Sequence, residues 1–188
     1  MTRIELQLTI NGERHDVVTE PHRTLLDLLR SEFGLTGTKE NCLEAECGVC
    51  TVLLDGRAVN ACILLAVQCQ GHDVLTIEGL GEDGRLHPLQ QAFIERGAVQ
   101  CGYCIPAMIL AAKAFLDECP APTEAEVREA LAGNLCRCTG YQKIAEAVLA
   151  AASDLARPSS RPSPSPRERE PLNPSPPPRG EGRVRGFQ

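Results

Sequence analysis

The stretch NCLEAECGVCTVLLDGRAVNAC, residues 41–62, carries four cysteines and the pattern of a complete β-hairpin. A run of apolar residues leads into Asp-Gly at positions 55–56, a pair that favours a tight type I′ turn between two antiparallel strands. If these two residues form the loop, Cys50 faces Ala61 across the hairpin and Cys62 lies one position beyond it. The hairpin therefore returns the last cysteine to the neighbourhood of the other three.

These four cysteines have the spacing of one metal-cluster motif. Four residues separate Cys42 from Cys47, two separate Cys47 from Cys50, and Cys62 is remote. Plant-type ferredoxins hold a [2Fe-2S] cluster with this spacing, and Gly48 would let the backbone approach such a cluster closely. A four-thiolate zinc site typically uses two Cys-x-x-Cys pairs, and only one pair here has that spacing. The spacing thus favours an iron-sulfur cluster over zinc, and a disulfide network is less favoured still.

A second set of four cysteines follows in QCGYC, residues 100–104, and NLCRC, residues 134–138. Its members are Cys101, Cys104, Cys136 and Cys138. Two of them open an expected helix, and the other two lie in the link between later helices. The N-terminal end of the expected helix carries a positive partial charge, which is favourable near anionic thiolates. Taken alone, this set is equally compatible with a zinc site of four thiolates.

The hydrophobic periodicity predicts an α+β fold in two parts. Residues 1–80 alternate apolar and polar positions in an N-terminal hairpin, then carry one amphipathic helix with Thr24 as its N-cap, and residues 81–156 have helical patterns only. The predicted helices of the second part span 88–97, 105–118, 123–133 and 140–156. We therefore expect a β-rich domain over residues 1–80 and a four-helix domain over residues 81–156.

Composition separates a tail from this body. Residues 157–188 contain nine prolines and few large apolar groups, which predicts a disordered segment. Residues 1–156 carry 12 basic and 22 acidic residues, a net charge of −10 that argues against a nucleic-acid partner. Neither a membrane span nor a signal peptide is expected, so we predict a cytoplasmic protein. Ten cysteines in a reducing compartment point to metal binding or catalysis in preference to disulfides.

Both cysteine motifs together resemble one known family. The chain resembles the small iron-sulfur subunits of the xanthine oxidase family of molybdenum hydroxylases, including those of carbon monoxide dehydrogenase, 4-hydroxybenzoyl-CoA reductase and isoquinoline oxidoreductase. The segments that carry the resemblance are ECGVCTVLLDGRAVNACILLAVQ (46–68), TIEGL (76–80), LHPLQQAFIERGAVQCGYC (86–104) and GNLCRCTGY (133–141). The resemblance covers about residues 3 to 154 and implies a β-grasp ferredoxin domain followed by a four-helix bundle, each with one [2Fe-2S] cluster.

The resemblance also implies roles for individual residues. The ligands of the outer cluster, which faces the flavin, are Cys42, Cys47, Cys50 and Cys62. The ligands of the inner cluster, which lies near the molybdopterin, are Cys101, Cys104, Cys136 and Cys138. Gln100 and Cys138 are implied to approach the pterin. Relatives often have glycines in the first cysteine loop, as in a C-G-x-G-x-C pattern, where this chain has Leu43, Glu44, Ala45 and Glu46.

The function implied by the resemblance is electron transfer inside an oxidoreductase complex. The chain would relay electrons from the molybdopterin of a large subunit, through its two clusters, to FAD in a medium subunit of a heterotrimer. No turnover of substrate is expected from this chain alone. Two alternatives stay open: a free two-cluster ferredoxin, and a binding protein with one iron-sulfur cluster and one zinc ion.

Overall fold

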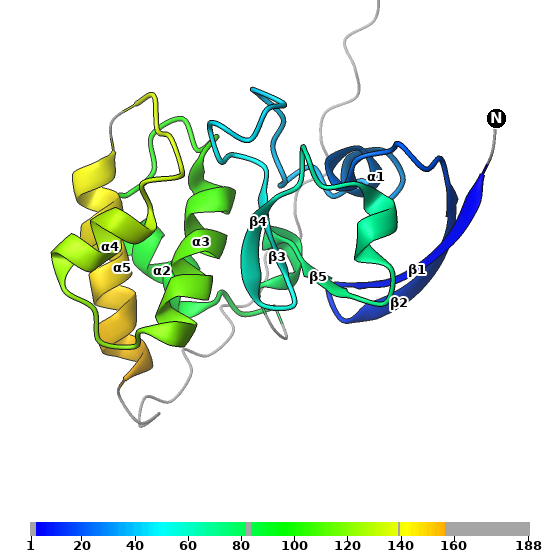
Figure 1. The fold of residues 1–188 in the computed structure, drawn as a ribbon. Helices are drawn as coiled ribbons and strands as arrows, with labels where there is room; N and C mark the ends of the chain where they lie inside the picture. The colour runs from blue at the N-terminus through cyan, green and yellow to red at the C-terminus, as the bar shows by residue number, and fades with distance from the viewer. Residues whose placement is uncertain (1–2, 82–83, 139, 157–188) are drawn as a thin grey trace, which may run out of the picture. The chain divides into compact units, whose positions relative to one another are not determined.

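The β-rich part contains one mixed sheet of five strands in the order β2-β1-β5-β3-β4 (Figure 1). The computed structural model describes residues 3–81, 84–138 and 140–156, and the predicted tail over residues 157–188 lies outside them. The strands are β1 (Ile4–Ile10), β2 (Glu13–Thr19), β3 (Thr51–Leu54), β4 (Arg57–Asn60) and β5 (Asp73–Leu75). β1 and β5 pair in parallel, and every other neighbouring pair of this sheet is antiparallel.

The hairpin of β3 and β4 has the predicted register. Leu54 pairs with Arg57, so Asp55 and Gly56 form a two-residue loop with φ angles of +48° and +81°. Positive φ at both loop residues is the signature of a type I′ turn, whose twist matches that of the flanking strands. The backbone N–H of Ala61 donates to the carbonyl of Cys50, which confirms that this hairpin continues to the cysteines.

Helix α1 (Leu25–Ser31) packs its apolar stripe into a first core beneath the sheet. The predicted cap is confirmed, because the backbone N–H of Asp27 donates to the hydroxyl of Thr24 over 3.1 Å. The core leucines of this helix are fully enclosed: Leu25, Leu26, Leu28 and Leu29. This core holds the sheet rigid next to the first cysteine loop.

The second part of the chain contains the four predicted helices (Figure 1). They are α2 (Pro88–Glu95), α3 (Ile105–Glu118), α4 (Glu124–Ala130) and α5 (Tyr141–Leu155). Thr123 and Glu126 form a reciprocal capping box at the start of α4, as Thr-x-x-Glu predicts. The sequence patterns did not predict the two short 3₁₀ helices, Ala66–Cys69 and Ile77–Gly79.

The helical core extends into the first cysteine loop. Cys47 and Val49 belong to the same buried cluster as Phe93 and Met108, and α3 packs against β3 and β4. The described residues 3–81, 84–138 and 140–156 accordingly belong to one compact unit that contains both cores. The division into domains at residues 80 and 81 stays a prediction. Among the helices described, none has the length and hydropathy needed to cross a membrane.

Candidate metal-cluster sites

The first cysteine set is arranged as two pairs of sulfurs. The Sγ atoms of Cys42 and Cys47 lie 3.3 Å apart at the two ends of the loop between them. Cys50 contacts Cys62, and the backbone N–H of Cys62 donates to the Cys50 sulfur. The β3–β4 hairpin makes the second pair, because it carries Cys62 back to the start of β3.

The loop between Cys42 and Cys47 turns its backbone N–H groups toward a sulfur. The N–H groups of Glu44, Cys47 and Glu46 donate to Cys42, and together with the thiol of Cys47 they lower the pKa of the Cys42 thiol to about 7. This turn requires left-handed backbone at Leu43 and Ala45, whose φ angles are +61° and +63°. These are the two positions at which relatives often have glycine.

The second set is also arranged as two pairs. The thiol of Cys138 donates to the sulfur of Cys101. In the second pair, the thiol of Cys104 donates to the sulfur of Cys136. Gly102, with φ of +82°, forms the turn between the first two cysteines, and α3 begins immediately after Cys104. A backbone N–H from Tyr103 lowers the pKa of Cys101.

The cysteines of each set differ in burial. Burial raises the pKa of Cys50 and of Cys104 to about 12, whereas Cys101 is exposed and Cys42 is half-buried. Metal ligands must be thiolates, and a bound cation supplies the charge that deprotonates a buried thiol. The buried members would therefore become thiolates when a metal is bound.

The paired arrangement fits a two-iron cluster. Four cysteines hold such a cluster, and each of its irons takes two of them. Within the described ranges, no three His, Cys, Asp or Glu side chains converge on one ion position. Each set presents its sulfurs two by two, as a cluster with two separate iron positions requires.

The two cysteine sets are joined by direct hydrogen bonds. The backbone N–H of Leu135, beside Cys136, donates to the carbonyl of Cys47 over 2.9 Å. Asn134, which is 6 % exposed, donates from its side chain to the carbonyl of Gly48 over 2.9 Å. Asn134 was not among the site residues predicted from the sequence, although its place two residues before a ligand candidate was a signal for it.

Two family comparisons match nearly all of the region that carries the cysteines. Residues 8–73 match the 2Fe-2S iron-sulfur cluster binding domain, and residues 76–149 match the [2Fe-2S] binding domain. The two matched regions divide the first cysteine set from the second.

Proteins similar over almost their whole length come from one group of enzymes. The chain is 55 % identical to the nicotinate dehydrogenase small FeS subunit of Eubacterium barkeri, over 79 % of this chain and 94 % of that protein. It is 47 % identical to the nicotine 6-hydroxylase small subunit of Paenarthrobacter nicotinovorans, over 81 % of this chain and 92 % of that protein. The chain belongs to the small iron-sulfur subunits of the xanthine oxidase family.

A solved structure agrees with this membership. Quinoline 2-oxidoreductase from Pseudomonas putida 86 contains a chain with 44 % sequence identity and a TM-score of 0.78, and the match covers 80 % of this chain and 94 % of that chain. This small iron-sulfur subunit therefore has the α+β fold expected for the family.

The outward edge of the second set lies next to Gln100. Gln100 and Cys101 are exposed, and Cys138 is half-buried. An added Cβ at Gly140 would lie 3.9 Å from Nε2 of Gln100, so this amide sits beside the segment that follows Cys138. The structure thus places the two residues implied to approach the pterin on the same accessible edge.

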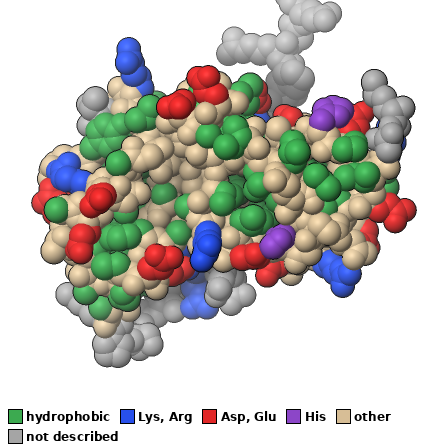
Figure 2. Space-filling view, viewed as in Figure 1, with side chains coloured by type: hydrophobic (Ala, Val, Ile, Leu, Met, Phe, Trp, Pro, Cys, Tyr) green, Lys and Arg blue, Asp and Glu red, His purple; other side chains and the backbone are tan. Residues whose placement is uncertain are grey.

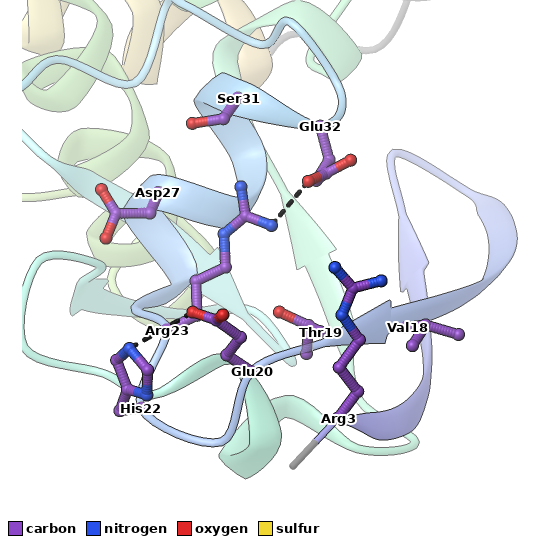
Figure 3. A pocket seen from close by; sticks show the side chains of 9 residues that line it. All are labelled: Arg3, Val18, Thr19, Glu20, His22, Arg23, Asp27, Ser31 and Glu32. Atoms are coloured by element: carbon purple, nitrogen blue, oxygen red, sulfur yellow. Dashed lines mark hydrogen bonds and ion pairs between the residues drawn. The ribbon is translucent and has the colours of Figure 1, made fainter. Parts of the chain in front are cut away.

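One hollow of the small subunit lies away from its cysteines. A cavity of about 590 Å³ is bordered by α1 and the first hairpin, and none of the ten cysteines lines it (Figure 3). Two pairs of its side chains contact one another: Arg23 binds Glu32 over 2.6 Å, and His22 lies 3.3 Å from Glu20. We assign this cavity no part in the candidate sites.

Glycine at position 43 or 45 is expected to stabilise the first cysteine loop. Left-handed backbone costs a residue with a side chain about 1–2 kcal/mol, and the extra freedom of glycine in the unfolded chain returns part of this. Leu43→Gly and Ala45→Gly should each raise the free energy of unfolding by up to about 1 kcal/mol. The measurement is urea unfolding of the full chain, followed by far-ultraviolet circular dichroism.

Glu44 is the matched control, because it lies between the two residues in the same loop and has no positive φ. Glu44→Gly should lower the free energy of unfolding. Equal losses in all three variants would contradict the assignment of strain to Leu43 and Ala45.

Proposed function

We propose that this chain is the electron-transfer subunit of a molybdenum hydroxylase complex and holds one [2Fe-2S] cluster in each cysteine set. The proposed ligands are Cys42, Cys47, Cys50 and Cys62 for the outer cluster, and Cys101, Cys104, Cys136 and Cys138 for the inner cluster. The observation that carries the proposal is that each set presents two pairs of sulfurs and that one hydrogen bond joins the backbones of the two sets.

The clusters supply one-electron redox chemistry, and the chain supplies their surroundings. Backbone N–H groups donate to the sulfurs of Cys42 and Cys101, which stabilises negative charge on the ligands. Because Cys50 and Cys104 are buried, water is excluded from the side of each site that faces the protein core. The reduction potential of such a cluster depends on hydrogen bonds to its sulfurs, on nearby charge and on its exposure to solvent.

The proposed partners are a large molybdopterin-binding subunit and a medium FAD-binding subunit. Hydrophobic side chains reach the surface of this chain between scattered charges (Figure 2). Leu43 and Ile63, which are 52 % and 60 % exposed, adjoin ligands of the outer set. Val99, Tyr103 and Leu135 are exposed beside the inner set. We propose that the first group meets the FAD-binding subunit and the second meets the molybdopterin-binding subunit, with Gln100 and Cys138 nearest the pterin.

The chain alone should not turn over substrate, because substrate is oxidised at the molybdenum centre of the large subunit. We further propose that the assembled heterotrimer is cytoplasmic. The proposed domains are residues 1–80 for the outer cluster and residues 81–156 for the inner one.

Metal and sulfide analysis of the purified protein tests the proposal. Two [2Fe-2S] clusters require about four iron and about four acid-labile sulfide per chain, with no zinc. About two iron with one zinc would overturn the assignment of the second set. Co-purification separates the remaining alternative, since a free ferredoxin would elute as a small monomer without molybdenum or flavin.

A further inference from the structure

The two cysteine sets are connected by one short backbone route. Leu135 is covalently linked to Cys136, and its N–H donates to the carbonyl of Cys47 over 2.9 Å. A single hydrogen bond therefore completes an otherwise covalent path from a candidate ligand of the inner cluster to one of the outer cluster. Electron exchange through a protein weakens steeply across gaps without bonds, so a bonded path of this kind is favoured.

A buried side chain holds this route in place. The Nδ2 group of Asn134 donates to the carbonyl of Gly48 over 2.9 Å and to the hydroxyl of Thr51 over 3.1 Å. The Thr51 hydroxyl donates in turn to the same Gly48 carbonyl over 2.6 Å. Asn134 is 6 % exposed and Thr51 is 5 % exposed, so water does not compete for these bonds.

The two cysteine loops pack closely around this network. A Cβ atom added to Gly48 would lie 2.3 Å from the carbonyl oxygen of Gly133 and 2.8 Å from Nδ2 of Asn134. The backbones of the two cysteine loops are therefore in direct contact where Asn134 joins them. Loss of the Asn134 bonds would let residues 133–136 move away from Cys47.

A second connection between the loops is longer. The hydroxyl of Tyr103 donates to the carbonyl of Glu40 over 2.5 Å, and Lys39 lies 5.9 Å from the centre of the tyrosine ring. This route runs through a whole aromatic side chain and reaches the other loop two residues before Cys42. It ties the loops together mechanically but offers a less direct path between sulfurs.

We propose that Asn134 is a positioning residue for electron exchange between the two clusters, because it keeps the Leu135 N–H bonded to the Cys47 carbonyl. The inference rests on the proposed function, which places a [2Fe-2S] cluster in each set. In the exchange, one electron leaves the reduced inner cluster and enters the oxidised outer cluster, and no bond breaks and no proton moves. Asn134 itself is neither oxidised nor reduced.

The test is electron paramagnetic resonance of the full-length chain in its purified complex, fully reduced with dithionite. In the wild type, two [2Fe-2S] signals should be split by their magnetic interaction. Asn134→Leu keeps a similar volume but removes both side-chain hydrogen bonds. We expect this variant to retain both signals and its full iron content and to show a smaller splitting than the wild type.

Three further variants complete the design. Thr123→Val is the matched control, because it removes a hydroxyl that accepts a backbone N–H at the start of α4, outside both cysteine sets and both proposed partner surfaces, and its splitting should equal that of the wild type. Thr51→Val is the second test if Asn134→Leu fails to fold, since it removes only the hydroxyl that Asn134 binds, and it should reduce the splitting. Tyr103→Phe should leave the splitting unchanged.

The possible results separate the two proposals. Unchanged splitting in Asn134→Leu, or in Thr51→Val where the first variant does not fold, would overturn the role of Asn134 while two clusters remain. A loss of splitting in Tyr103→Phe alone would assign the connection to the tyrosine route and also overturn it. A wild-type protein without two iron-sulfur signals would overturn the proposed function and this inference together.

Discussion

Replacing Cys104 with alanine is expected to remove one whole [2Fe-2S] cluster and to leave the other in place. The Cys104 side chain is buried at the start of α3 and contacts Cys136, so alanine leaves the inner cluster with three of its four proposed ligands. Iron should fall from about four to about two per chain, and one of two paramagnetic signals should vanish. Iron analysis and electron paramagnetic resonance of the purified complex measure both effects.

Cys119 provides the matched control for this substitution. Cys119 is the C-cap residue of α3, at the end of the helix opposite Cys104, and it belongs to neither cysteine set. Cys119→Ala should keep about four iron per chain and both signals. Retention of all the iron in Cys104→Ala would show that Cys104 is not a ligand, and loss of both signals would show that the sets do not fill separately.

Replacing Gly48 with alanine is expected to be the most destabilising change in the first cysteine loop. Gly48 has φ of +68°, and an alanine Cβ would lie 2.3 Å from the backbone oxygen of Gly133. Left-handed strain and overpacking together should cost about 2–4 kcal/mol. Because the clash separates the two loops, the outer cluster should be lost at a lower temperature. Visible absorption of the cluster during heating of the complex measures this loss.

Gly34→Ala distinguishes backbone strain from the clash. Gly34 has φ of +65°, nearly the same as Gly48, but nothing lies within 4 Å of an added Cβ. This control should cost only about 1 kcal/mol and should leave the cluster in place. Equal effects of the two alanines would contradict the close contact between the loops at Gly48.

Local signals predicted most of the secondary structure. Asp55-Gly56 specified the hairpin loop and its register, because a type I′ turn needs two consecutive residues with positive φ. Thr24 and Thr123 specified helix starts, because each hydroxyl accepts a backbone N–H within the same turn. Such interactions join residues a few positions apart, so they can be read from a short stretch of sequence.

The cap of α2 was not predicted from the sequence. His87 accepts the backbone N–H of Leu89 and forms a capping box with Gln90, although histidine is not among the preferred capping residues. The start of the helix at Pro88 was nevertheless predicted correctly, since proline suits the first turn.

The sequence by itself determined the two sets of cysteines, the α+β fold and the family, because these depend on spacing and on residues adjacent in the chain. Only the tertiary structure decided how the sulfurs pair within each set and how the two sets meet. Gly48 illustrates the difference: its sequence context suggested room for a cluster, but its neighbour in the fold is the backbone at Gly133, 85 positions away. The contacts of Asn134 with Gly48 and Thr51 arise where the link between α4 and α5 meets the first cysteine loop and the start of β3. Their partners are distant in the chain, so no local pattern encodes them.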